Sequence, residues 1–459
     1  MSLLRRILQE ADGLRRSLFA SSSGNLKSRI VKGAAGSFAL KIGSAGLSFI
    51  VGVLLARLLG ASGYGTYAYA TAWVSLLSVP SVMGLDKLLV REIAVYEKLQ
   101  QWGAIRRILS WSNFLALGAS VAIACIASAA AWIIAGERVD TRFYSFWIAL
   151  LLLPVVSATR LRQSALRGLH RVIAGQLPEM LVQPGLLIIF LGAATFVAQK
   201  EMNAPWALWM NLGATIVSCI FGAAILHRTL PGEARSARPE PTHPEWIRSA
   251  VPLMLLSGLQ ILNTKVDILM LGSMVGTGET GIYSVANRGA TLVTYILVAV
   301  NAALGPAVAS LHASGDRQRL QRMVTKSSRI VLFFSLPVCM GLIAFGDIFL
   351  RLFGRDFVSG WTVLSILSAG QLFSAMMGSV TLILVMTGHE RDAVITLGGS
   401  TLLNVLLNLL LIPRWGIEGA AYASTASTIM RNTVAAAFAY RRLGISSTAL
   451  GPIGRDRAS

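Results

Sequence analysis

Few side chains of this sequence could do chemistry in an apolar setting, and three of them lie within eight residues. Gln260, Asn263 and Asp267 are separated by three and four residues, so they share one face if this stretch is a helix. A carboxylate is costly to place inside an apolar segment, so one that occurs there marks a candidate functional site. Asp267 is therefore a candidate site for coupling to a proton or other cation, with Asn263 and Gln260 beside it, or else the partner of an arginine in a cavity. The alternative is a structural ion pair between packed helices.

A second set of candidates is cationic. The predicted substrate-binding residues are Lys265, Arg288, Arg431, Lys41, Arg57 and Asn287. A guanidinium group is a planar donor that suits a phosphate, so Arg288 and Arg431 are the leading members of this set. For Lys41, Arg57 and Arg288 a competing explanation is that the side chain extends to the nearer membrane surface. Arg431 lies too deep in its apolar stretch for that explanation.

The elements that must position these residues are transmembrane helices. Hydrophobic residues make up 54% of the 459 residues and charged residues only 14%, a composition that excludes an ordinary soluble enzyme. Apolar runs of about 20 residues recur along the chain, which is the length that crosses a bilayer as a helix. The alternating pattern of a membrane barrel is not visible. The predicted spans are 35–59, 66–86, 110–135, 144–160, 178–198, 205–227, 247–275, 281–308, 328–350, 361–387, 393–413 and 417–440.

The basic residues predict how these spans are oriented. The net charge of +20 gathers in alternate loops and not on one amphipathic face, so it indicates topology and no binding of nucleic acid. With both termini in the cytoplasm, about 30 of the 41 Lys and Arg residues lie on the inner side, as the positive-inside rule requires. The first 34 residues form a basic amphipathic segment that lies on the membrane surface or a tail that only sets orientation.

The chain also repeats itself. Gly65, with Tyr67 two residues later, matches Gly281, with Tyr283 two residues later, and two further pairs of short stretches match at a separation of about 215 to 220 residues. Each repeat contains an even number of spans, so the halves are expected to be related by a two-fold axis along the membrane normal. The predicted architecture is an all-α integral membrane protein of about twelve helices in two six-helix lobes. The predicted parts are 1–34, an N-lobe 35–227, a cytoplasmic linker 228–246, a C-lobe 247–441 and a cytoplasmic tail 442–459.

Three short motifs resemble those of one transporter family. The segment from Leu54 to Tyr67, LLARLLGASGYGTY, resembles the opening of the Wzx-type polysaccharide flippases. The stretches DILMLG at 267–272, followed by GIY at 281–283, and LFGRDF at 352–357 are similar to elements of that family in corresponding places. The resemblance implies membership of the multidrug/oligosaccharidyl-lipid/polysaccharide exporter superfamily, with two lobes that open alternately to either side.

The same resemblance implies a function and its partners. Wzx-type proteins move undecaprenyl-diphosphate-linked sugar units across the bacterial inner membrane, for the synthesis of O-antigen, capsule or exopolysaccharide. The implied partners are that lipid-linked oligosaccharide, membrane lipids, a proton or sodium ion, and the polysaccharide polymerase and glycosyltransferases of the pathway. A cationic cleft suits this cargo, because a diphosphate taken into a low-dielectric site needs compensating cations.

Two other functions compete with this one. A multidrug antiporter of the same architecture needs buried carboxylates for organic cations, and the first six spans hold no deep Asp or Glu. A membrane polymerase or ligase needs a large outer loop or a convergent acid/base set, and the outer loops are short. No P-loop, HExxH helix or GxSxG elbow occurs, so the sequence predicts no cofactor, no metal site and no catalytic residue.

Overall fold

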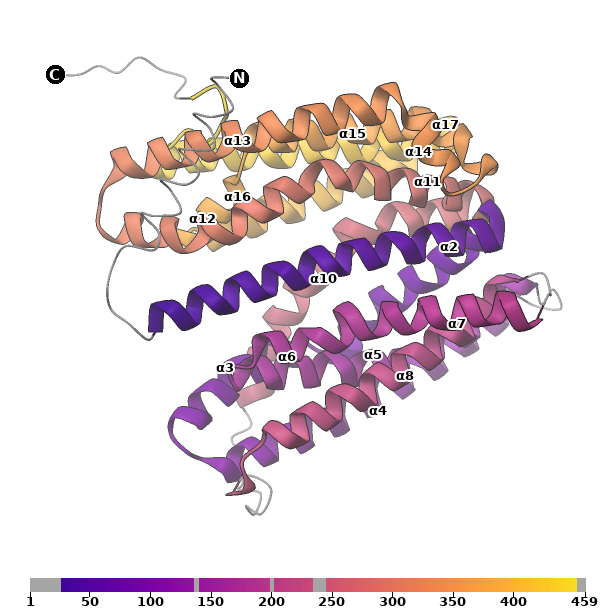
Figure 1. Ribbon diagram of the computed structural model, residues 1–459, viewed down its shortest axis with the longest axis horizontal. Coiled ribbons are helices and arrows are strands. Elements are labelled where there is room, and N and C mark those ends of the chain that lie inside the picture. Colours follow the sequence, from indigo (N-terminus) through magenta and orange to yellow (C-terminus); the bar gives the residue numbers. More distant parts are fainter. Residues whose placement is uncertain (1–25, 136–139, 199–201, 234–244, 452–459) are drawn as a thin grey trace.

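The computed structural model describes residues 26–135, 140–198, 202–233 and 245–451, and all the regular structure in these ranges is helical (Figure 1). Most of the predicted N-terminal amphipathic segment lies outside the described residues, as do most of the predicted linker and the last eight residues. The lobe boundaries at 227 and 247 therefore stay predictions.

The first half of the chain supplies six spans. Its elements are α2 (Leu26–Val82), α3 (Leu85–Lys98), α4 (Trp102–Ala135), α5 (Thr141–Gly168), α6 (Val172–Leu177), the π-helical turn η1 (Pro178–Val182), α7 (Gln183–Ala198) and α8 (Ala204–Thr229). The long helix α2 is two spans. At Gly60 the backbone has φ 65° and ψ −178°, a conformation that only glycine adopts readily, and the chain reverses direction there (Figure 1).

The second half repeats this plan. Its elements are α10 (Glu245–Met274), α11 (Thr277–Thr291), η2 (Leu292–Thr294), α12 (Tyr295–Ala313), α13 (Arg317–Ala344), α14 (Gly346–Arg351), η3 (Arg355–Gly360), α15 (Trp361–Met377), α16 (Val380–Met386) and α17 (Glu390–Leu443). Like α2, α17 holds two spans, because the backbone at Gly416 leaves the helical conformation with φ 54°.

The span count agrees with the prediction. Ten segments in the described ranges are long and apolar enough to cross a membrane, and two of them, in α2 and α17, hold two spans each, which gives twelve. Several helices extend beyond the predicted limits into basic stretches: α4 begins at Trp102, α5 ends at Gly168 and α13 begins at Arg317. A helix does not need to stop where the hydrocarbon stops, because its backbone hydrogen bonds are satisfied internally in either medium.

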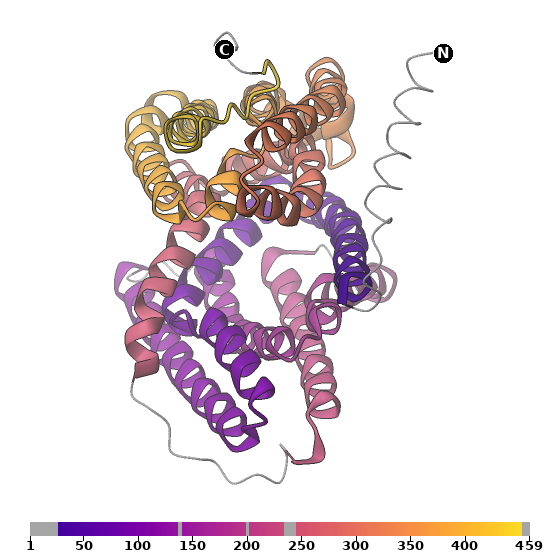
Figure 2. The same ribbon diagram turned by 90° about the vertical axis from the view of Figure 1, so that its left-hand side faces the viewer.

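The two halves form two bundles. The helices α4 to α8 lie together, and α12 to α17 form the second bundle (Figure 1). Figure 2 looks along the helices and shows the first span of α2 and the helix α10 on opposite sides between the bundles. The main contacts across the halves are those of α2 with α11 and with α10.

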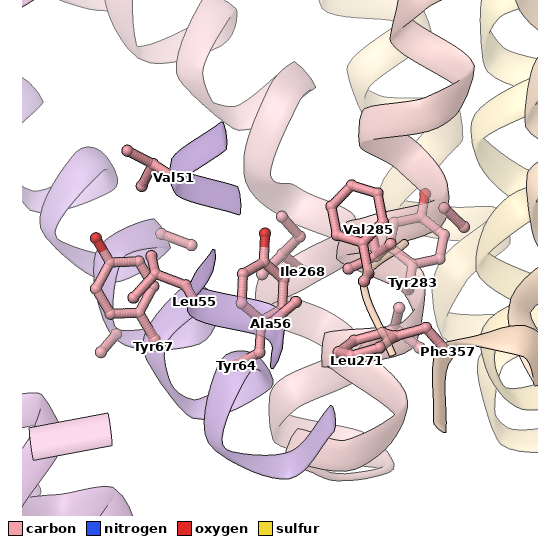
Figure 3. Close-up of a cluster of buried hydrophobic side chains, with 14 of the residues drawn as sticks. Val51, Leu55, Ala56, Tyr64, Tyr67, Ile268, Leu271, Tyr283, Val285 and Phe357 are labelled. Atoms are coloured by element: carbon pink, nitrogen blue, oxygen red, sulfur yellow. The ribbon is translucent and has the colours of Figure 1, made fainter. Parts of the chain in front are cut away.

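The largest buried apolar cluster crosses between the halves. Figure 3 shows Leu55 and Tyr64 of α2 beside Ile268 of α10, Tyr283 of α11 and Phe357 of η3, all of them buried. The halves therefore share a core near Gly60, where the first two spans join. That shared core fixes the position of the polar side chains described next.

Candidate functional site

Two glycines bring the backbones of the halves together near Gly60. A Cβ added at Gly65 would overlap the carbonyl oxygen of Thr277, and a Cβ added at Gly281 would overlap the carbonyl oxygen of Ala61. Gly65 and Gly281 are the matching positions of the sequence repeat, and Ala61 and Thr277 have the same separation. A reciprocal contact of this kind is what a two-fold axis produces. The axis therefore passes between these glycines.

Aromatic and backbone contacts extend this junction on one side. The ring of Tyr64 meets that of Phe357 edge to face, with centroids 6.0 Å apart, and Phe49 packs in the same way on Phe353 at 5.5 Å. The Nε of Arg57 donates a hydrogen bond to the carbonyl oxygen of Leu352, 2.7 Å away. Two of the motifs that carry the family resemblance, 54–67 and 352–357, thus pack directly against each other. We call this set of contacts the Gly60-end junction.

Arg288 lies just inside this junction, and it reaches across the halves. Its Nη1 donates to the carbonyl oxygen of Ser48 in α2, 2.9 Å away, and its guanidinium carbon lies 6.0 Å from the centroid of the Tyr64 ring. A Cβ at Gly52 would come within 2.6 Å of Nη1, so a glycine at that position makes room for the arginine. Half-buried Arg288 thus connects α11 to the first span of α2.

Lys265 is the second cation at this place. It is half-buried on α10 and close enough to Arg288 for the two charges to interact, as is the hydroxyl of Tyr67. Within the described part of the chain neither cation has a carboxylate within 4 Å. The structure therefore brings together two cations, from α10 and α11, whose charges no described acid compensates.

The other predicted substrate-binding residues lie at different places. Lys41 is exposed and lies two turns from Ser48 on the same face of α2, about 10 Å along the helix from the anchor of Arg288. Asn287 is half-buried beside Arg288. Arg57 is exposed, and its Nε is occupied by the bond to Leu352. Of these three residues, only Asn287 lies next to Arg288, and Lys41 and Arg57 lie at other places on α2.

Asp267 is at the centre of a separate buried network. Its carboxylate, in a residue that is only 8% exposed, accepts hydrogen bonds from Tyr283 and Ser424 at 2.8 Å and from Asn408 at 2.7 Å. These donors come from α11 and from both spans of α17. The alternative prediction of an ion pair is not seen, since no described basic side chain lies within 4 Å of Asp267.

Arg431 belongs to the same interface and not to the pair formed by Lys265 and Arg288. Its Nη1 donates to Oδ1 of Asn263 at 3.0 Å, and the Asn263 amide donates to Thr401 at 3.2 Å. Gln260, one turn before Asn263, is exposed. Of the three residues predicted to share a face of α10, Asn263 and Asp267 thus contact α17. Gln260 does not lie in this interface.

Lys265 is on another face of α10, because residues two apart point in different directions. Gly258 and Gly272 are seven residues before and after Lys265 and share its face. A Cβ at Gly258 would touch Val79, and one at Gly272 would collide with the ring of Tyr69. The Lys265 face of α10 therefore packs on the second span of α2.

The aromatic part of this site and a half-buried arginine, Arg162, are not among the residues predicted from the sequence. Tyr64 and Tyr67 border Arg288, although they occur in the motif that carries the resemblance. Arg162 follows the predicted span 144–160, but in the structure it lies within α5, contacts Sγ of Cys219 and donates to the Cys219 carbonyl oxygen at 3.3 Å. Buried Leu161, Ala165 and Gly168 at helical spacing are the signal that this helix continues.

Comparison with known proteins gives a consistent family and fold. The model of the family described as polysaccharide biosynthesis protein matches residues 30–312, and the MatE model matches residues 252–410. A probable low-salt glycan biosynthesis flippase, Agl15 of Haloferax volcanii, is 23% identical over 405 residues, which cover 86% of this chain and 80% of that protein.

Two solved structures share the fold. An inward-facing multidrug resistance transporter of the MATE family superposes with a TM-score of 0.73 at 14% identity, over 89% of this chain and 94% of that one. The lipid II flippase MurJ in an inward closed conformation superposes with a TM-score of 0.69 at 16% identity, over 90% of this chain and 87% of that one.

Proposed function

Because the chain belongs to the polysaccharide biosynthesis protein family, we propose that it is a flippase for lipid-linked oligosaccharides. The proposed cargo is an undecaprenyl-diphosphate-linked sugar unit, moved across the bacterial inner membrane for the synthesis of O-antigen, capsule or exopolysaccharide. The name of the relative Agl15, a glycan biosynthesis flippase, supports this cargo class. The proposed partners are membrane lipids and the glycosyltransferases and polymerase that make and use the cargo.

The observation that carries the proposal is the pair of cations between the halves. Lys265 and Arg288 are half-buried and lack a described carboxylate partner. Cations held together in a low-dielectric place repel each other, and an anion between them removes that cost. A diphosphate supplies the matching charge, and the fork of Arg288 can bind two of its oxygens. An antiporter of organic cations would need the opposite charge here.

The proposed transport cycle follows from where the halves touch. The positive-inside rule puts the Gly60-end junction on the outer side, with both chain termini in the cytoplasm. The headgroup then arrives from the cytoplasmic side, where Lys41 is exposed on the Arg288 face of α2. In this scheme Arg288 and Lys265 bind the diphosphate, and Arg57 belongs to the outer junction that must open before release. Arg288 contacts both halves, so binding there can respond to their relative motion.

The Asp267 network is the proposed ion-coupling site. A carboxylate that accepts three neutral donors and has no described cationic partner can take up a proton or a sodium ion without first breaking an ion pair. Its donors come from α11 and α17, so a change of charge there alters the packing of three helices. Asn263 and Arg431 continue the same interface toward the other end of α10.

Transport in liposomes tests the cargo. The experiment follows a fluorescent undecaprenyl-diphosphate oligosaccharide in vesicles that contain either the wild type or the double variant Lys265→Gln/Arg288→Gln. Charge-assisted hydrogen bonds contribute about 1.5–3 kcal/mol each, so we expect the rate at low substrate to fall by at least about tenfold. Arg319→Gln, at an exposed position at the start of α13, is the matched loss of charge and should transport normally. A double variant that transports at the wild-type rate would disprove the proposed headgroup site.

A further inference from the structure

A cavity of about 560 Å³ lies beside the first bundle, and its lining includes neither Lys265 nor Arg288. Tyr69 and Trp73 of the second span of α2 form one wall, and residues of α4 and α5 form two others. The fourth side is Gly272 of α10, which belongs to the other half of the chain. We call this cavity the α4 groove.

The α4 groove has the chemistry of a site for a hydrocarbon chain. The rings of Tyr69, Trp73 and Phe146 form a continuous edge-to-face row, with centroids 6.3 Å apart at each step. On α4, Ile126 and Ile134 line the groove and are 69% and 81% exposed, and both are in an apolar membrane span, so we infer that the groove opens to the lipid. A chain can therefore enter sideways from the membrane without crossing water.

Charge is confined to one end of the groove. The charged residues in its lining are Asp140 and Arg142, at the start of α5 on the side of the Gly60-end junction. The rest of the lining reaches down α4 to Ile123, eleven residues before Ile134, or about 16 Å of helix. An apolar slot of this length, with polar groups at the membrane surface only, fits an extended chain and not a polar solute.

The groove adjoins the wall that carries Lys265. Gly272, on the fourth side of the groove, shares a face of α10 with Lys265 two turns away, and Tyr69 packs directly on Gly272. An anionic headgroup at Lys265 and a long tail in the groove would thus lie against the same helix. The contact between Tyr69 and Gly272 crosses between the halves, so it can open and close as they move.

We propose that the α4 groove binds the polyisoprenoid tail of the transported lipid while the headgroup is between the halves. This inference rests on the proposed function and adds to it a second subsite, selective for the length and shape of the tail. The tail then stays in hydrocarbon throughout, and the protein guides it along α4. Tail recognition separates the cargo from bulk phospholipid, whose acyl chains lack the isoprenoid methyl branches.

Two neighbouring alanines of α4 make a matched test. Ala130 lines the groove and Ala129 does not, and both are exposed to lipid. An indole at Ala130→Trp fills the groove, whereas Ala129→Trp adds the same bulk outside it. Each variant is compared with wild type in liposomes on two substrates that carry the same diphosphate oligosaccharide, one on undecaprenyl and one on the short farnesyl chain. Ala130→Phe provides a smaller obstruction, should the indole lower the amount of folded protein.

The inference predicts a loss that depends on the tail. Ala130→Trp should raise the KM for the undecaprenyl substrate by about tenfold, or 1.4 kcal/mol, and leave that for the farnesyl substrate within about twofold. Ala129→Trp should match wild type on both. Equal KM values for Ala130→Trp and Ala129→Trp on the undecaprenyl substrate would overturn this inference and leave the proposed function intact. Displacement of bound phospholipid by Ala130→Trp with no change in transport would have the same meaning. A wild type that moves neither lipid would overturn the proposed function and this inference with it.

Discussion

A methyl group at Gly281 should separate the two halves of the protein at the Gly60-end junction. In the structure a Cβ at Gly281 would overlap the carbonyl oxygen of Ala61 and would also come within 3.0 Å of the backbone nitrogen of Gly65. Both obstacles are main-chain atoms of a packed helix, which cannot rotate away as a flexible side chain can. The overlap can be relieved only by moving α11 away from α2. Gly281→Ala therefore acts on the contact between the halves and not on either bundle.

The size of the effect follows from the cost of overpacking. Inserting a methyl group into a well-packed interface costs about 1–3 kcal/mol. In the proposed transport cycle the contact exists only when this end is closed, so the cost falls on that conformation alone. The ratio of open to closed molecules should then rise by about 5- to 150-fold. Gly65→Ala meets the Thr277 oxygen and should act in the same direction. The double variant Gly65→Ala/Gly281→Ala should raise the ratio of open to closed molecules little further, because halves that are already apart no longer touch at the second glycine.

Distances between spin labels measure this ratio. Cysteines introduced at Asp140, at the start of α5, and at Ser359, in η3, put one label on each half at the same end of the molecule, after the native cysteines are replaced. Gly281→Ala should increase the fraction of long distances at the expense of short ones. Gly278→Ala is the matched control on the same helix, because a Cβ at Gly278 meets open space. Identical distance distributions for the two variants would refute the argument from the junction.

Two other positions make separate predictions. Asp267→Asn removes the charge of the buried network and leaves too few acceptors for its three donors, so transport driven by a proton or sodium gradient should be lost while downhill exchange of substrate persists. This is measured in liposomes with and without the gradient, and the control is Asp316→Asn, at the half-buried N-cap of α13. Gln321→Ala removes three hydrogen bonds, two to the backbone N–H and carbonyl of Ser446 and one to the Thr325 hydroxyl, and should lower the free energy of unfolding by about 1–3 kcal/mol. A thermal unfolding curve of the purified protein checks this, and exposed Gln318→Ala should leave its midpoint unchanged; equal midpoints for the two variants would contradict a stabilising role for this contact.

The spans and their repeat were predictable because local properties determine them. A run of about 20 apolar residues must be helical in a bilayer, whatever surrounds it. The matching positions of Gly65 and Gly281 could be read from the sequence for the same reason. Their role in the contact between the halves could not be predicted, since it depends on two carbonyl groups from helices more than 200 residues apart. The helix α3 was missed because it is short and amphipathic, with only Leu85, Leu88, Leu89 and Ile93 buried.

The grouping of the charged residues was the least predictable part. Spacing along α10 correctly separated Lys265 from Asn263 and Asp267, because a helix has a fixed turn. Which neighbouring helix each face contacts depends on the packing of the whole bundle, and this packing determines the hydrogen-bond partner of Arg431. From the sequence, Arg431 and Arg288 are both leading phosphate-binding candidates, and Arg431 is the deeper of the two. In the structure its partner is Asn263, while Arg288 reaches a carbonyl oxygen of the other half.

The two faces of α10 connect the proposed ion site to the proposed headgroup site. Asp267 faces α17 and is bound by Asn408 and Ser424, whereas Lys265 is on the face whose glycines, Gly258 and Gly272, pack on the second span of α2. The two residues are two positions apart on one helix, whose backbone hydrogen bonds make it move as a unit. A change of charge at Asp267 that shifts α10 against α17 must therefore shift Lys265 against α2 as well. Gly258 and Gly272 on the Lys265 face let the α2 helix approach closely, which is what such a sliding contact requires. Coupling through one rigid helix needs no chain of intermediate side chains between the sites.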